Sequence, residues 1–414
     1  MAEIRPFRGI RYDAGRLSGD LSAVLAPPYD VLEQADKDRL LTKSHRNIVG
    51  IDLPHLPPKS AGPAKVYEDA AKKLADWRRD GTLIQDAEPS LYIYHQKFTH
   101  EGRRFTRPMF IASVRLRAFD EGVILPHEKT FGGPKEDRLA LMKATGCALS
   151  PIFGLYSDPG NDIGRLFASS IARPAIAAGT VEGVENHLWQ VTDVGTINSV
   201  SRTLADRRVY IADGHHRYGT ALMYRDSVRE RNGGRLPNDH PADFVMFVLA
   251  SMDDPGCLIL PYYRTLTGIS LDPLQSAWAE GVREVPSRDQ ADLVLHDGKT
   301  GREAAVVFTN REALDRLAAD ECGAWRKLDY AYLHRYLIDE LLTKKAGHPP
   351  SIHYLKSREL AIQTAKDESG VALLVKATPL AQLRAVAEAG GLMPQKSTYF
   401  HPKLATGMTI LALR

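Results

Sequence analysis

The sequence predicts a mixed α/β fold, because strand-like and helix-like runs alternate in the middle of the chain. Across residues 186–233, strand-like runs alternate with amphipathic helical runs, and such alternation is typical of layered α/β structures. NHLWQVTD and RRVYIADG have strand composition, whereas VGTINSVSRTLAD and HHRYGTALMYRDSVRERNG show helical spacing. The 414 residues are enough for two or three domains of roughly 150 residues each.

Residues 1–157 form the first predicted domain. PAKVYEDAAKKLADWRRDG repeats its apolar residues at helical spacing, and Gly81 is a natural stop for this helix. PSLYIYHQKFT and RPMFIASVRLRAF predict two strands joined by a turn at Glu101-Gly102. A second helix is predicted to begin near Pro134, and SPIFGLYSD predicts a short buried strand.

Residues 158–270 form the second predicted domain, and residues 271–414 form a C-terminal α/β domain. The second contains the alternating strands and helices. It closes with ADFVMFVLASMDDPGCLILPYYRTL, which predicts two apolar strands around a turn at residues 254–256. The third contains helices such as AYLHRYLIDELLTK and ends in an apolar, strand-like run.

Composition excludes several classes of protein. The net charge of +3 is small for this length, so we expect no DNA partner. The cysteines, Cys147, Cys257 and Cys322, form no close pair, so neither a disulfide framework nor a thiolate metal site is expected. The N-terminus has no apolar signal core, and no apolar run reaches the roughly 18 residues of a membrane span. We therefore expect a cytoplasmic location.

The central motif is RVYIADGHHRYGTAL, where a buried strand ends in a group of charged and polar residues. Gly214 permits a tight strand-to-helix turn, and the residues after it open a helix. Since the first amides of a helix attract anions, we expect a phosphate here, with His215, His216 and Arg217 as additional donors. The alternative is that the histidines are satisfied groups inside the fold.

Asp213 ends the strand, and three roles stay open for it. It holds a metal ion, accepts a proton in catalysis, or caps the helix. Adjacent histidines on a helix point about 100° apart, which is poor geometry for joint zinc binding. Mg²⁺ held by Asp213 and substrate phosphates is more plausible than zinc.

Two motifs offer carboxylates for general-base catalysis. In LPHEKTFGGPKEDRLAL, His127 and Glu128 lie in a polar loop and form a candidate base for a hydroxyl group. In LAPPYDVL, two prolines stiffen the backbone and present Asp30 on a rigid turn. The alternative for the first motif is a solvated loop before a helix.

The tail motif MPQKSTYFHPKLATG gathers polar and aromatic groups. Its Lys396, Ser397, Thr398 and Lys403 are candidates for a phosphate clamp. The glycine spacing of a P-loop is absent upstream, so a Walker motif is rejected. The alternative is a surface tail.

These four motifs, in this order, resemble the signature segments of the domain-of-unknown-function family 1015. The strand–helix–strand–helix unit that ends at Asp213–Arg217 also resembles the core of the ParB/sulfiredoxin superfamily, in which a turn at a helix start binds nucleotide phosphates. Sulfiredoxins have a reactive cysteine where this chain has His215, which argues against sulfinic-acid repair. Free serine kinases of that superfamily carry the same five residues, Asp-Gly-His-His-Arg.

The resemblance implies a nucleotide-dependent phosphotransferase acting on a small hydroxyl metabolite, with free L-serine as the first acceptor. ADP or ATP and Mg²⁺ are the implied cofactors. Two alternatives stay open: a phosphoserine phosphatase at the same site, and a ParB-like nucleotide-binding regulator without turnover. The resemblance does not identify the base, for which Glu128 is the first candidate and Asp30 the second. The oligomeric state also stays open, a homodimer included.

Overall fold

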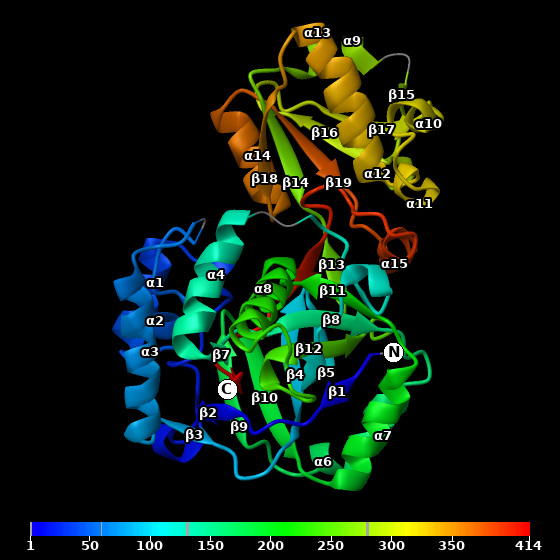
Figure 1. Ribbon diagram of the computed structural model, residues 1–414. Coiled ribbons are helices and arrows are strands. Elements are labelled where there is room, and N and C mark those ends of the chain that lie inside the picture. The colour runs from blue at the N-terminus through cyan, green and yellow to red at the C-terminus, as the bar shows by residue number, and fades with distance from the viewer. Residues whose placement is uncertain (1, 59, 130–131, 279–280) are drawn as a thin grey trace. The chain divides into compact units, whose positions relative to one another are not determined.

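The computed structural model describes residues 2–58, 60–129, 132–278 and 281–414, and the mixed α/β fold is confirmed. The chain forms two compact units (Figure 1). Unit 1 comprises Met1–Pro126, Thr130–Cys257 and Pro402–Arg414, and unit 2 comprises His127–Lys129 and Leu258–His401. This division differs from the three predicted domains, because strands on both sides of residue 157 belong to one sheet.

A mixed sheet is the centre of unit 1. Within the described residues it has nine strands in the order β6-β11-β8-β12-β5-β4-β10-β9, with β1 paired to β5. These strands are β1 (Ile4–Arg5), β4 (Leu91–His100), β5 (Arg103–Arg115), β6 (Ile124–Leu125), β8 (Ile152–Tyr156), β9 (Ala177–Val181), β10 (Val184–Val191), β11 (Val209–Asp213) and β12 (Phe244–Ser251). Two short pairs join β2 (Ile10–Tyr12) to β3 (Leu83–Gln85), and β7 (Cys147–Ala148) to β21 (Leu411–Ala412).

The helices of unit 1 pack on this sheet and on one another. They are η1 (Ala14–Leu17), η2 (Tyr29–Val31), α1 (Gln34–Lys43), α2 (Val49–Asp52), α3 (Ala64–Arg79), η3 (Phe119–Glu121), α4 (Gly132–Thr145), α5 (Asp162–Leu166), α6 (Ala168–Ile171), α7 (Val194–Ala205), α8 (His215–Arg231) and η4 (Pro241–Asp243). Helix α4 packs between α3 and α8 (Figure 1). The core joins Val200 of α7 and Tyr218 of α8 to Phe247 of the central strand β12.

Strand β12 is buried along nearly its whole length, as its continuous apolar run VMFVLA requires. It pairs with β5 on one side and β8 on the other. The sequence predicted that this run and the next one, CLILPYYRTL, flank a turn, and the turn at residues 254–256 is present. The second run, however, contributes β13 and β14 to unit 2, so the two strands do not pair.

Unit 2 is built on a six-stranded antiparallel sheet in the order β15-β17-β16-β19-β14-β18, within the part of the chain that is described. Its strands are β13 (Leu258–Leu260), β14 (Tyr263–Thr267), β15 (Val282–Glu284), β16 (Leu293–Asp297), β17 (Glu303–Phe308), β18 (Ser351–Leu355), β19 (Val371–Val375) and β20 (Tyr399–His401). Its helices are α9 (Leu271–Trp278), η5 (Arg288–Gln290), α10 (Ala313–Leu317), α11 (Gly323–Arg326), α12 (Asp329–Ala331), the π-helix η6 (Tyr332–Leu342), α13 (Thr343–Ala346), α14 (Arg358–Asp367) and α15 (Leu380–Glu388). Strands β13 and β20 form a separate pair.

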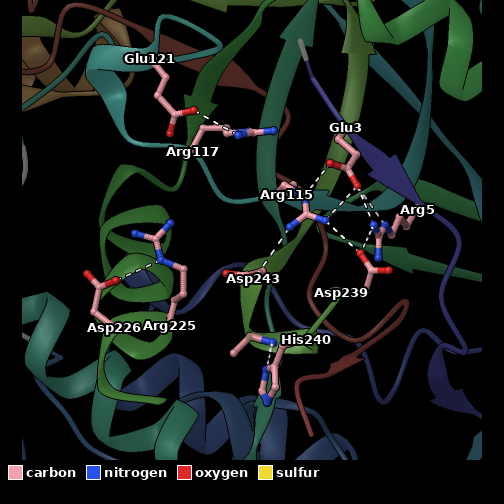
Figure 2. A network of polar contacts seen from close by, with 11 residues as sticks. Glu3, Arg5, Arg115, Arg117, Glu121, Arg225, Asp226, Asp239, His240 and Asp243 are labelled. Atoms are coloured by element: carbon pink, nitrogen blue, oxygen red, sulfur yellow. Dashed lines mark hydrogen bonds and ion pairs between the residues drawn. The ribbon is translucent and has the colours of Figure 1, made fainter. Parts of the chain in front are cut away.

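A network of ion pairs fixes the N-terminal strand to unit 1 (Figure 2). Glu3 accepts hydrogen bonds from Arg5 at 2.8 Å and from Arg115 at 2.5 Å. The same two arginines contact Asp239. Both guanidinium groups also lie over the ring of Phe244. Exposed pairs are weak individually, but this group shares its partners and joins β1, β5 and the segment before η4.

Among the described residues, no helix has the length and apolar character needed to cross a bilayer.

Candidate functional site

The predicted strand-to-helix turn is present at the end of β11. Gly214 has φ 91° and ψ 28°, in the left-handed region, and α8 begins at the next residue. The N–H of Tyr218 donates to the carbonyl of Gly214 at 3.0 Å and makes the first hydrogen bond of the helix. The amides of His215, His216 and Arg217 therefore lie in the first turn of α8, where a helix attracts anions.

Asp213 lies between two cations at this turn. Its carboxylate is 3.1 Å from the guanidinium of Arg217 and 3.3 Å from the Nζ of Lys403. Burial raises the pKa of the Asp213 carboxyl, but Lys403, Arg217 and His215 outweigh burial and hold that pKa well below its usual range. Asp213 is therefore ionised at neutral pH. Asp213, Arg217 and Lys403 together carry one net positive charge, which favours an anionic ligand.

Arg217 has protein partners on the inner side of the turn. Its side chain is buried, and its guanidinium donates to the carbonyl of Pro151 and to Asp213. The sequence predicted that Arg217 donates to phosphate. In the structure its guanidinium also links Asp213 to the carbonyl of Pro151, just before β8. His215 is buried and His216 half-buried.

The rigid turn at LAPPYDVL lies close to the same arginine. Pro28 precedes the short helix η2, in which Tyr29 is buried and Asp30 exposed. Burial lowers the pKa of Arg217, but Asp213 first and then Asp30 raise it above its ordinary value. The structure thus brings Asp30 within electrostatic range of the turn and leaves its carboxylate accessible to a hydroxyl group.

The segment Pro402–Arg414 connects these two parts of unit 1. Thr406 and Ala26 exchange backbone hydrogen bonds of 2.8 and 3.2 Å just before the proline turn. Lys403, three residues earlier, forms the ion pair with Asp213. The predicted tail motif is therefore divided, since Lys403 belongs to unit 1 and Lys396, Ser397 and Thr398 belong to unit 2.

A small pocket lies behind the turn in unit 1, with Arg217 in its wall. It contains about 400 Å³ of empty space, open solvent at its mouth included. Arg138 donates to Asp137 and to the carbonyl of Asp52, while Ser150 donates to the Asp52 carboxylate at 2.7 Å. Burial raises the pKa of Asp52, and Arg138 and Ser150 oppose that rise. Sequence reasoning missed Asp52 and Ser150, because neither lies in a polar cluster.

The remaining predicted residues come together in unit 2. The Nε2 of His127 is 3.0 Å from the hydroxyl of Thr398, and the N–H of Met393 donates to the carbonyl of His127 at 2.8 Å. The hydroxyl of Ser397 donates to Pro394.

Lys396 and Glu128 belong to the same group in unit 2. Lys396 has a left-handed φ of 55°, and its carbonyl accepts a hydrogen bond from Arg264 at 2.9 Å. Glu128, the neighbour of His127, is half-buried. His127–Lys129 and the QKST motif therefore belong to unit 2, whereas Asp30, Asp213–Arg217 and Lys403 belong to unit 1.

The residues around Asp213 do not fit a metal ion held by protein ligands. In the part of the chain that is described, no three His, Cys, Asp or Glu side chains lie close enough together to hold a metal ion. The Asp213 carboxylate already contacts two cations, and a third positive charge there would be repelled. Asp213 therefore acts as a counter-ion of Arg217 and Lys403 and not as a metal ligand.

A family model described as a protein of unknown function (DUF1015) matches residues 4–331. The chain therefore belongs to the DUF1015 family, as the motifs indicated, although the tail motif lies beyond the matched residues. A search of the curated proteins found no match.

Several solved structures resemble this chain weakly. A free serine kinase in complex with ADP is 12% identical with a TM-score of 0.36, covering 73% of this chain and 92% of the kinase. SbnI from Staphylococcus aureus, with a C-terminal truncation, is 12% identical with a TM-score of 0.38, covering 73% and 87%. A conserved hypothetical protein from Pyrococcus furiosus is 14% identical with a TM-score of 0.34, covering 74% and 95%. Similarity at this level is too weak to assign a function, so the residues of the site must do so.

Replacing Gly214 with alanine is expected to lower the free energy of unfolding by about 1–3 kcal/mol. A Cβ there would lie 2.9 Å from the Nε of Arg217, on a backbone with φ of 91° that alanine rarely adopts. Gly219→Ala, in the second turn of the same helix, is the control. Its Cβ would lie 3.0 Å from the Lys135 side chain on a normal helical backbone, so a smaller loss than for Gly214→Ala is expected. Chemical denaturation and calorimetry measure both effects, and equal stabilities for the two variants would contradict the strained turn.

Proposed function

We propose that this protein is a nucleotide-dependent phosphotransferase acting on a small hydroxyl metabolite, with free L-serine as the first acceptor to test. The observation that carries the proposal is the turn at Asp213–Arg217 with Lys403 beside it. It combines the N-terminus of a helix with the one net positive charge of Asp213, Arg217 and Lys403. ADP or ATP is the donor, and a cytoplasmic location belongs to the same proposal.

The chemistry needs positioning and neutralisation of charge more than covalent catalysis. The amides at the start of α8 and the ammonium group of Lys403 hold the phosphates of the nucleotide. His215 and His216 add donors next to these amides. Arg217 and Asp213 act as supporting residues, because their ion pair fixes the turn and the Lys403 ammonium group in place.

The transfer step requires a base for the acceptor. The hydroxyl oxygen forms a bond to the terminal phosphorus, and the bond from that phosphorus to the bridging oxygen of the nucleotide breaks. The hydroxyl proton passes to a carboxylate. Asp213 is a poor base, since its pKa lies far below neutral pH. Asp30, exposed and near Arg217, suits this role in unit 1, and Glu128 in unit 2 remains the other candidate.

Phosphorus NMR tests the proposal directly. The protein is incubated with Mg²⁺, ADP or ATP, and L-serine, and separately with phosphoserine alone. Appearance of phosphoserine supports the kinase. Inorganic phosphate from phosphoserine would instead support a phosphatase at the same site. Tight nucleotide binding without product would support the regulator without turnover, and the absence of nucleotide binding would contradict both the kinase and the regulator.

Asp30→Asn is expected to reduce the turnover number by about 10²–10⁴-fold while nucleotide affinity changes less than threefold. The carboxylate takes the proton from the acceptor but does not hold the phosphates. Glu128→Gln in the same assay tests the other candidate base. Asp38→Asn, an exposed carboxylate on α1, is the matched control. Loss of nucleotide binding in Asp30→Asn would contradict its role as the base.

A further inference from the structure

A fully buried arginine lies near the start of the C-terminal segment in unit 1. Arg107 of β5 is 0% exposed. It donates to the side-chain oxygen of Gln96 and, at 2.6 Å, to the carbonyl of Pro402. Its guanidinium lies 4.8 Å from the ring centroid of Phe153. A buried strand position usually holds an apolar side chain, and burying a cation there costs free energy that its hydrogen bonds must offset.

Gln96 of β4 completes the arrangement. It is 1% exposed and pairs directly with Arg107 across the two strands. Its Nε2 donates to the carbonyl of Lys403 at 3.0 Å and to Asn186 at 3.1 Å. The carbonyls of two successive residues, Pro402 and Lys403, are therefore bound by one cross-strand pair.

This geometry fixes the backbone from which the lysine side chain extends. Lysine has a long, flexible side chain that loses considerable conformational freedom when it is held in one position. Anchoring the carbonyls on both sides of its Cα limits where the ammonium group can lie. The Nζ of Lys403 is then 3.3 Å from Asp213, beside the open end of α8.

We propose that Arg107 and Gln96 are positioning residues that place the Lys403 ammonium group beside Asp213 to contact the phosphates of the nucleotide. The phosphate contact rests on the proposed function, whereas the placement of Lys403 is a property of unit 1 itself. The pair acts through Lys403 and does not touch the ligand. It therefore controls affinity for the phosphate chain and not for the nucleoside.

Calorimetry with ADP, AMP and adenosine tests the phosphate contact. Gln96→Met and Arg107→Met are expected to weaken ADP binding about tenfold while adenosine binding is unchanged. The ADP affinity of Arg107→Lys is expected to lie between that of these variants and that of the wild type. In a Lys403→Met background the same changes are expected to have no further effect, because interacting residues are not additive. Lys97→Met, an exposed neighbour of Gln96 on β4, is the control. Equal losses for ADP and adenosine, or additive losses with Lys403→Met, would overturn the assignment.

A measurement without nucleotide separates this proposal from the proposed function. Reductive methylation with carbon-13 gives the dimethylammonium group of Lys403 its own NMR signal, assigned with Lys403→Met. In Gln96→Met and Arg107→Met this signal is expected to move toward that of an exposed lysine, with thermal unfolding showing that each variant is folded. An unmoved signal in both variants overturns the placement. A moved signal together with a wild-type protein that binds no nucleotide means that only the proposed function, and the phosphate contact with it, has failed.

Discussion

Replacing Arg217 with alanine is expected to abolish measurable nucleotide binding and to lower the free energy of unfolding by about 3–5 kcal/mol. The substitution leaves Asp213 largely buried with one of its two cations gone, and it leaves the carbonyl of Pro151 without its guanidinium donor. The turn then loses the contact that joins the end of β11 to the start of β8. Calorimetry measures the binding, and chemical denaturation measures the stability.

Two further variants make the result interpretable. Arg217→Lys keeps the charge but has only one nitrogen to serve two acceptors, so both effects are expected to be intermediate. Arg229→Ala removes an exposed arginine from the same helix, and a change below about 1 kcal/mol is expected. If Arg217→Ala is as stable as Arg229→Ala and still binds nucleotide, Arg217 does not fix the turn as proposed.

Replacing Asp213 with asparagine is expected to cost about 3 kcal/mol of stability at pH 7 and nearly nothing in strong acid. Lys403, Arg217 and His215 hold the pKa of Asp213 below the value of about 3.9 that an unfolded chain shows. The charged carboxylate therefore stabilises the folded state above about pH 4. That contribution disappears as the pH falls through the lower pKa of the folded state. Denaturation curves from pH 2 to pH 7 measure it.

Nucleotide binding separates the roles predicted for Asp213. If it serves as a counter-ion, Asp213→Asn adds one net positive charge and is expected to retain nucleotide affinity within about tenfold. If it were a metal ligand, the variant would lose any dependence of binding on Mg²⁺. Asp226→Asn on the exposed side of α8 is the control. A wild-type-like pH dependence of stability in Asp213→Asn would contradict the depressed pKa.

Much of the fold of unit 1 could be predicted from local patterns. The strand ending at Asp213, the turn at Gly214 and the helix after it all appear as predicted, because glycine and the apolar spacing act over a few residues. Strand β9 was missed, since AAGTV lacks the apolar alternation of a strand and forms by pairing with β10. The separation of β12 from β13 was also missed, because strand pairing depends on distant partners.

The candidate site was predictable in its motifs but not in its partnerships. The spacing of Asp213 and Arg217 by four residues was a usable signal for an ion pair, although the turn directed attention to phosphate. Nothing local indicates that Lys403 reaches Asp213, or that Tyr29 and Asp30 lie near Arg217. For the partners of Lys403, the sequence offered one signal: Arg107 is a charged residue at the start of an apolar strand run.

The division of unit 1 along the chain has a consequence for its biosynthesis. A ribosome makes residues 1–257, then the 258–401 region of unit 2, and only afterwards residues 402–414, which pair with Ile10, Ala26 and Ala148. A nascent chain that has passed Arg217 thus lacks the lysine beside Asp213 and the last strand of the β7–β21 pair. Unit 1 therefore reaches its final structure only after the 258–401 region of unit 2 has been made, and until then the turn lacks the charge of Lys403.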